Sequence, residues 1–230
     1  MKLPFTIEQF LEVFKNYNTT FYPLQGVFLL LAAYVIFLLV RNKSRSGKII
    51  TIILAILWLW MGAAYHIAFF SVINKAAYIF GSLFILQGIL FFRYGLINRP
   101  SFAIHKNIAG VVSVSLIFYA LLIYPLIGYF SGHGYPFSPT FGLPCPTTIF
   151  TLAVLIVAKQ SPPLYIIIIP VLWSVIGFSA AFSLGIYEDL ALIVSGLAFI
   201  ILFFINRKSP HVCQPLAEKK DQPGLDHGGL

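Results

Sequence analysis

The sequence has 230 residues, of which 59% are hydrophobic and only 10% are charged, and its mean hydropathy is +0.91. These values exclude a soluble globular domain and indicate a polytopic membrane protein, so the lipid bilayer is its first expected partner. The net charge of +8 would suggest nucleic acid as a partner for a soluble protein. Here the basic residues sit in short loops between apolar segments, where they mark topology, and we expect no nucleic-acid binding.

Residues 1–20 predict a short amphipathic helix that lies in the membrane interface and acts as an anchor. Thr6 can cap its start, Gln9 completes a capping box, and Phe5 can pack against Phe10. Apolar and charged residues then alternate at helical spacing. Residues 207–230 are polar and contain several prolines and glycines, which predicts a disordered cytoplasmic tail.

Residues 21–206 predict an all-α bundle of seven transmembrane helices. Most of the apolar segments reach the roughly 20 residues that a helix needs to cross a bilayer. The seven segments are 21–40, 49–70, 76–94, 108–130, 146–158, 163–182 and 190–206.

The basic residues predict the orientation of this bundle. Twelve lysines and arginines fall on one side of the seven segments and three on the other. Cytoplasmic loops carry the excess of positive charge. We therefore expect an outside N-terminus, a cytoplasmic C-terminus and an outside loop at residues 131–145.

That loop leads to the one segment that is too short to cross. Residues 146–158 reach only roughly 20 Å as a helix, whereas a hydrocarbon core is about 30 Å thick. Either this helix thins the bilayer, or it begins below the surface after a loop that dips into the protein. In the second case Pro146 is the first helical residue and Cys145 lies at the cap. Thr147 and Thr148 then face a polar cavity, as in the broken helices of transporters. A purely structural outer cap is the alternative.

Four polar or aromatic residues lie deep in the apolar segments. Trp58 and Trp173 are near the middle of the second and sixth segments, Gln87 is halfway along the third, and His66 is near the outer end of the second. Polar groups at that depth need hydrogen-bond partners. They line a pocket together with Cys145, Thr147 and Thr148, or they join helices by packing.

A short pattern suggests an internal repeat. Trp58 and Gly62 have the same spacing as Trp173 and Gly177, and small residues follow in both segments. Segments one to three and five to seven then correspond, with the fourth as linker. This three-plus-one-plus-three arrangement resembles the parallel-repeat transporters of the sugar-carrying SWEET type.

Two other function classes stay open. His66, His133 and Cys145 could ligate a metal in a periplasm-facing metal-handling or redox accessory protein, but their spacing does not require it, and we expect no metal and no cofactor. A membrane-embedded lipid-modifying enzyme similar to ceramidase-like hydrolases would need several histidines with Asp and Ser, so no catalytic residue is assigned. Glu188 and Asp189 suit a helix start at the outer surface. We expect no proton-relay carboxylate within the membrane, which argues against a proton-driven pump.

Four stretches cover most of the chain and carry a family resemblance: LWLWMGAAYH, INKAAYIFGSLFILQG, GHGYPFSPTFGLPCPTTIFTL and IPVLWSVIGFSAAF. They resemble a family of small bacterial integral membrane proteins of unknown function, sometimes labelled permeases. The resemblance implies a bacterial inner-membrane protein and no particular substrate. We therefore expect a permease-like or solute-binding protein rather than an enzyme, whose outward-facing polar pocket takes a small polar or anionic solute.

Overall fold

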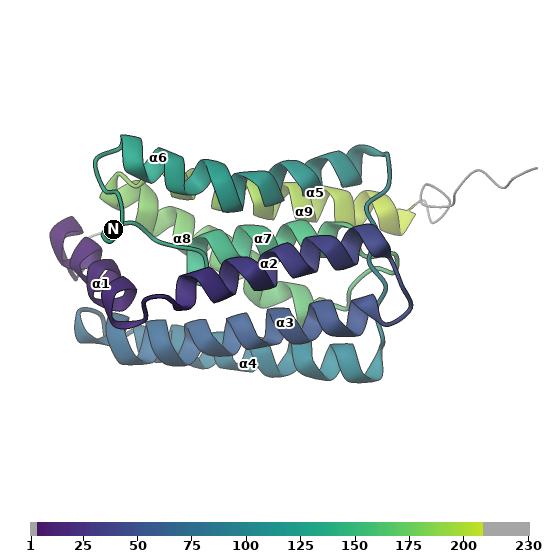
Figure 1. The fold of residues 1–230 in the computed structure, drawn as a ribbon, viewed down its shortest axis with the longest axis horizontal. Helices are drawn as coiled ribbons and strands as arrows, with labels where there is room; N and C mark the ends of the chain where they lie inside the picture. Colours follow the sequence, from purple (N-terminus) through teal and green to yellow (C-terminus); the bar gives the residue numbers. More distant parts are fainter. Residues whose placement is uncertain (1–3, 209–230) are drawn as a thin grey trace, which may run out of the picture.

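The computed structural model describes residues 4–208, and in that part the chain is all-α, with isolated β-bridges and no β-strand (Figure 1). The helices are α1 Ile7–Thr20, α2 Leu24–Arg41, α3 Ser46–Trp60, η1 Met61–Phe69, η2 Phe70–Val72, α4 Ala77–Ile97, α5 Ile108–Phe118, η3 Tyr119–Ile123, α6 Tyr124–Phe130, α7 Pro144–Ile156, α8 Leu164–Leu184, η4 Tyr187–Asp189 and α9 Leu190–Lys208. Several run on without a break, so that α3, η1 and η2 form one long rod.

Six of these rods are long and apolar enough to cross a membrane, which supports a multi-pass membrane protein. They are Leu24–Arg41, Ser46–Val72, Ala77–Ile97, Ile108–Phe130, Leu164–Leu184 and Tyr187–Ile205. The remaining apolar helix, α7, has only 13 residues. The expected count of seven transmembrane helices is therefore not confirmed.

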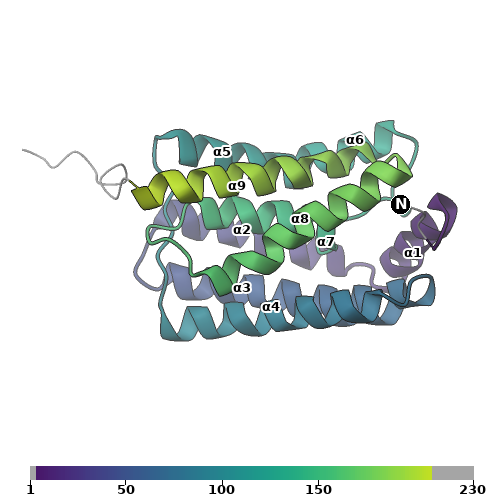
Figure 2. The same ribbon diagram turned by 180° about the vertical axis from the view of Figure 1, so that it is seen from behind.

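Helix α7 lies in the middle of the bundle, and all 13 of its residues are buried (Figures 1 and 2). It packs against α5, α8 and α9. Ser113 of α5 donates a 2.7 Å hydrogen bond to the carbonyl of Ala153. The helix begins at Pro144 with Leu143 at the cap position, two residues before the expected start at Pro146. Because protein surrounds it on every side, it does not need the length that lipid contact would demand.

Helix α1 lies across one end of the bundle (Figure 1). Its capping box between Thr6 and Gln9 is present as predicted, and the Phe5 and Phe10 rings stack with centroids 5.5 Å apart. Its apolar face is buried against the protein through residues that include Phe14 and Tyr17. Helix α1 thus covers one end of the bundle, and its position in the membrane interface stays a prediction.

The opposite end gathers the basic loops. Loops 98–107 and 157–163 meet there, with Ala103 N–H donating to Val157 O at 3.0 Å and Lys159 N–H to Ser101 O at 2.8 Å. The turn between α2 and α3 and the end of α9 lie at the same end (Figures 1 and 2). The loops that carry most of the lysines and arginines thus lie at one end of the bundle, opposite α1.

The structure does not test two of the expectations from the sequence. The predicted tail, 207–230, falls outside the described residues from 209 onward. The three-plus-one-plus-three repeat stays a prediction. It would make Trp58 and Trp173 equivalent, but the Trp58 indole has a hydrogen-bond partner and the Trp173 indole has none among the described residues.

Candidate functional site

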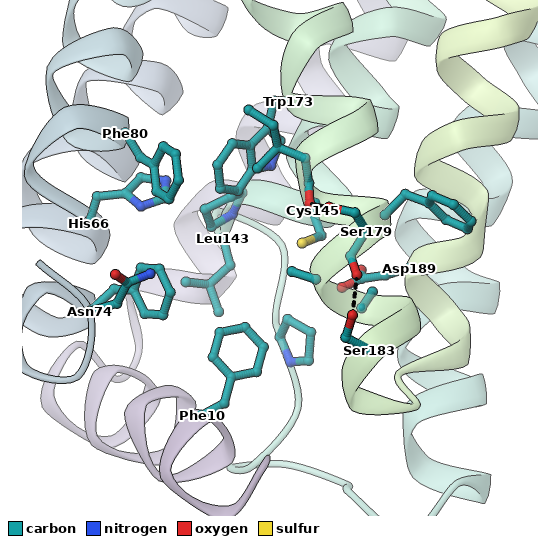
Figure 3. Close-up of a pocket in the computed structure, with 18 of the residues that line it drawn as sticks. Phe10, His66, Asn74, Phe80, Leu143, Cys145, Trp173, Ser179, Ser183 and Asp189 are labelled. Carbon is teal, nitrogen blue, oxygen red and sulfur yellow. Dashed lines mark hydrogen bonds between the residues drawn. The ribbon is translucent and has the colours of Figure 1, made fainter. Parts of the chain in front are cut away.

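A cavity of about 500 Å³ lies beneath α1, between η1, the start of α7 and the last turns of α8. We call it the α1 cavity. Figure 3 shows His66 on one side of it, Cys145 and Asp189 on the other, and Phe10 of α1 between them at the α1 end. Its volume is in the range of small-molecule sites, which are about 300 to 1,000 Å³. Much of its wall is aromatic, from Phe5, Phe10, Phe14, Tyr65, Phe70 and Phe80.

His66 borders this cavity and is fully buried. Neither of its ring nitrogens has a hydrogen-bond partner among the described residues. Aromatic rings surround it, with the Phe84 centroid at 4.5 Å and the Trp173 centroid at 5.1 Å. It belongs to η1, a π-helical stretch, and such widened turns are frequent at functional sites. A buried imidazole with both nitrogens free is costly, and a ligand in the cavity could satisfy it.

Trp173 of α8 also borders the cavity and is 8% exposed. Its indole Nε1 is a second buried donor without a partner in the described part of the chain. Gly177 lies beside this nitrogen, one turn further on, and a Cβ there would be 3.5 Å from Nε1 and 2.8 Å from Cδ1 of Leu192. An acceptor and a donor therefore lie close together at one wall of the cavity.

Cys145, Thr147 and Thr148 stand at the start of α7, as predicted, but only Cys145 lines the cavity. The Thr147 hydroxyl accepts a 3.0 Å hydrogen bond from the Gly142 N–H, which fixes the loop to the helix. The Thr148 hydroxyl is buried without a partner among the described residues. Gly142 has a φ of +101°, and a Cβ there would lie 2.2 Å from the Phe28 ring, so this close turn requires glycine.

Trp58 and Gln87 join helices at some distance from the cavity. The Trp58 indole donates to the Thr151 hydroxyl at 3.0 Å and stacks on Phe84 at 4.5 Å. The Gln87 amide donates to Ile166 O at 3.0 Å, which ties α4 to α8. Neither residue lines the cavity. Of the seven proposed binding residues, the structure brings His66, Cys145 and Trp173 together around one space.

Sequence reasoning missed the acidic side of the site. Glu188 and Asp189 were expected at the outer surface, but their side chains are buried, with residue exposures of 0% and 2%. Asp189 lines the cavity and accepts a short hydrogen bond from the Tyr124 hydroxyl. One signal could have found them, since they are the only acidic residues between Glu12 and the tail.

The described residues contain no cluster of three or more His, Cys, Asp or Glu side chains placed to hold a metal ion. No arginine or lysine belongs to the lining of the cavity in residues 4–208. What the arrangement offers chemically is an aromatic enclosure with a few hydrogen-bonding groups and one carboxyl group.

Comparison with known proteins identifies a family and nothing more specific. No curated protein and no solved structure matches the chain. Residues 7–213 match the model of a family described as "Family of unknown function (DUF6064)". This agrees with the resemblance to membrane proteins of unknown function and gives no support to the permease label. Because the match covers most of its 230 residues, the chain belongs to the DUF6064 family.

Proposed function

We propose that this protein is a permease-like or solute-binding protein of the bacterial inner membrane, and that its ligand occupies the α1 cavity. In this proposal the N-terminus and the cavity face the outside and the C-terminus is cytoplasmic. The observation that carries it is the pair of buried groups that have no hydrogen-bond partner within residues 4–208, His66 and Trp173, beside a cavity large enough for a small molecule. The basic loops at the far end of the bundle support the orientation.

The lining supports a ligand with an aromatic or aliphatic body. Most of the cavity wall is apolar, and among the described residues its lining holds one acidic side chain, Asp189, and no lysine or arginine. An anion would meet no positive charge there, so the anionic solute is the less favourable option. A neutral molecule with one hydrogen-bonding group would instead bury its body against the phenyl rings and pair that group with His66 or Trp173.

Roles follow for the remaining predicted residues. Thr147 holds the loop before α7, and Trp58 and Gln87 fix α7 and α8 relative to α3 and α4. In this proposal they position the cavity wall and do not touch the ligand.

Binding of phenylnaphthylamine tests the proposal, because this uncharged fluorescent amine has a phenyl and a naphthyl group and one N–H donor. The purified protein in lipid nanodiscs should enhance its fluorescence beyond empty nanodiscs. His66→Ala should weaken binding about fivefold, which corresponds to the loss of one hydrogen bond of about 1 kcal/mol. His105→Ala, in the loop at the far end of the bundle, is the matched control and should bind as wild type. The proposal would be contradicted if empty nanodiscs gave the same fluorescence as nanodiscs with the protein, or if His66→Ala bound the probe as tightly as wild type.

Thiol labelling tests access to the same space. In a Cys213→Ser background, Cys145 is the only cysteine. We expect a membrane-impermeant maleimide to label it in intact cells, and phenylnaphthylamine to slow that labelling. If the maleimide labels Cys145 only after the membrane is disrupted, the proposed orientation is wrong.

A further inference from the structure

Two consecutive carboxyl groups, Glu188 and Asp189, are buried in η4, which packs against α6, α8 and α9. The Glu188 side chain is fully buried, and neither of its oxygens accepts a hydrogen bond from a described residue. Its Oε1 lies 3.2 Å from Nδ1 of His133 in the loop after α6. These two atoms are within the distance over which a proton passes from one to the other.

Asp189 connects this pair to the α1 cavity. Its carboxyl group accepts a hydrogen bond from Tyr124 of α6 and interacts in the same way with the Cys145 thiol. Asp189 and Cys145 both line the cavity. A ligand that enters the cavity therefore changes the hydration of Asp189, one residue away from the Glu188 and His133 pair.

The balance of charge around the two carboxyl groups requires bound protons. The titratable groups that face them are Tyr65 of η1, Tyr119 of η3, Tyr124, His133 and Cys145. No lysine or arginine of the described chain forms an ion pair with either carboxylate. His133 can neutralise one negative charge at most. An unpaired buried charge costs several kcal/mol, so the second carboxyl group is most stable when it holds a proton.

We propose that Glu188, Asp189 and His133 form a proton-binding site that couples occupancy of the α1 cavity to pH. His133 is 11% exposed and receives the proton from the aqueous side. As the Nδ1–H bond of His133 breaks, the Oε1–H bond of Glu188 forms. Carboxyl groups inside a membrane protein commonly serve proton relays. The proposal departs from the sequence-based expectation that no proton-relay carboxylate lies within the membrane.

The coupling rests on the proposed function, because it needs a ligand in the cavity. By linkage, a ligand that changes the proton affinity of Asp189 or Glu188 has a pH-dependent affinity of its own, by the same factor. Uptake or release of protons would then accompany ligand binding.

Infrared difference spectroscopy tests the proton site without any ligand. Spectra of the purified protein, recorded between mildly acidic and mildly alkaline pH, should contain the C=O band of a buried protonated carboxyl group. Glu188→Gln or Asp189→Asn should remove or shift that band. Glu12→Gln, which changes an exposed carboxylate on α1, should leave it in place. A spectrum without a band assigned to Glu188 or Asp189 would overturn the proton site.

Proton exchange on ligand binding tests the coupling between the α1 cavity and the proton site. Addition of phenylnaphthylamine to wild-type protein in weak buffer should change the pH of the solution. Glu188→Gln should bind the probe and show less proton exchange, because Glu188 does not line the cavity. Probe binding without any pH dependence or proton exchange would overturn the coupling while leaving the proposed function intact. If the probe does not bind wild type, the proposed function and the coupling both fail, and the infrared result alone decides the proton site.

Discussion

The indole Nε1 of Trp60 donates a hydrogen bond of 2.6 Å to the phenolic oxygen of Tyr17. This contact joins the last residue of α3 to α1, which covers the cavity. Tyr17 is 1% exposed and packs edge-on against Tyr65 and Phe69 of η1. The position of α1 over the bundle therefore depends on an aromatic cluster that contains this polar contact, and on the hydrogen bonds that Asn18 donates to the carbonyls of Pro136 and Ser138.

Removal of this polar contact should weaken the attachment of α1. Tyr17→Phe keeps the ring and leaves the Trp60 N–H without its acceptor. We expect a loss of about 1 kcal/mol in the free energy of unfolding. Thermal unfolding in detergent measures it, with Tyr22→Phe as the control because Tyr22 is 73% exposed. Equal losses for both variants would show that the hydrogen bond contributes nothing.

Stability should also fall at alkaline pH through Tyr17. Burial raises the pKa of Tyr17 from 10.0 to about 12, and the hydrogen bond from Trp60 opposes this rise only in part. The folded state therefore keeps the proton that the unfolded state releases. The contribution is fully present below pH 10 and is lost between about pH 10 and 12, by as much as about 3 kcal/mol. The difference between the wild-type and Tyr17→Phe unfolding curves should narrow or invert over that range, and a constant difference would contradict the prediction.

Two threonines one turn apart on α7 should respond differently to the loss of their hydroxyl groups. Thr151→Val leaves the buried Trp58 indole without an acceptor, so we expect a loss of about 1 kcal/mol in stability. Thr148→Val removes a buried hydroxyl that has no partner in the described chain, so it should be neutral or stabilising. Thermal unfolding of both variants in parallel provides the comparison. A stability loss for Thr148→Val would mean that its hydroxyl has a partner.

Close approach of η1 and α4 should make Gly62 intolerant of a side chain. A Cβ at Gly62 would lie 2.7 Å from the carbonyl oxygen of Gly81, whose position a helix backbone fixes. We expect Gly62→Ala to cost roughly 1 to 3 kcal/mol, as overpacking does. Gly26→Ala in α2 is the matched control, because nothing lies within 4 Å of its Cβ position and alanine favours helix. Melting temperatures of the two variants that shift equally would refute the prediction.

The sequence predicted those features that depend on residues close together in the chain. The capping box at Thr6 and Gln9 needs only four residues of chain, and it is present. The apolar rods also begin and end within a few residues of their predicted limits, because the length that spans a bilayer is visible in composition alone. The short helix at 146–158 was found for the same reason.

Tertiary packing decided the rest. Trp58 and Trp173 have the same local pattern, yet one indole finds Thr151 and the other finds no partner, because different helices face them. Glu188 and Asp189 lie at a helix start in either environment. Contacts from distant parts of the chain bury them, His133 against Glu188 and Tyr124 against Asp189. The π-helical turn at His66 left no pattern in the hydropathy.

The full burial of α7 has a consequence for how the protein is made. A helix of 13 residues is too short to be held by lipid alone, so it has no stable position in the bilayer before its neighbours are there. Helices α5 and α6 precede it in synthesis, but α8 and α9 follow it. The segment must therefore wait, at the membrane surface or within the insertion machinery, until the last two spans close around it.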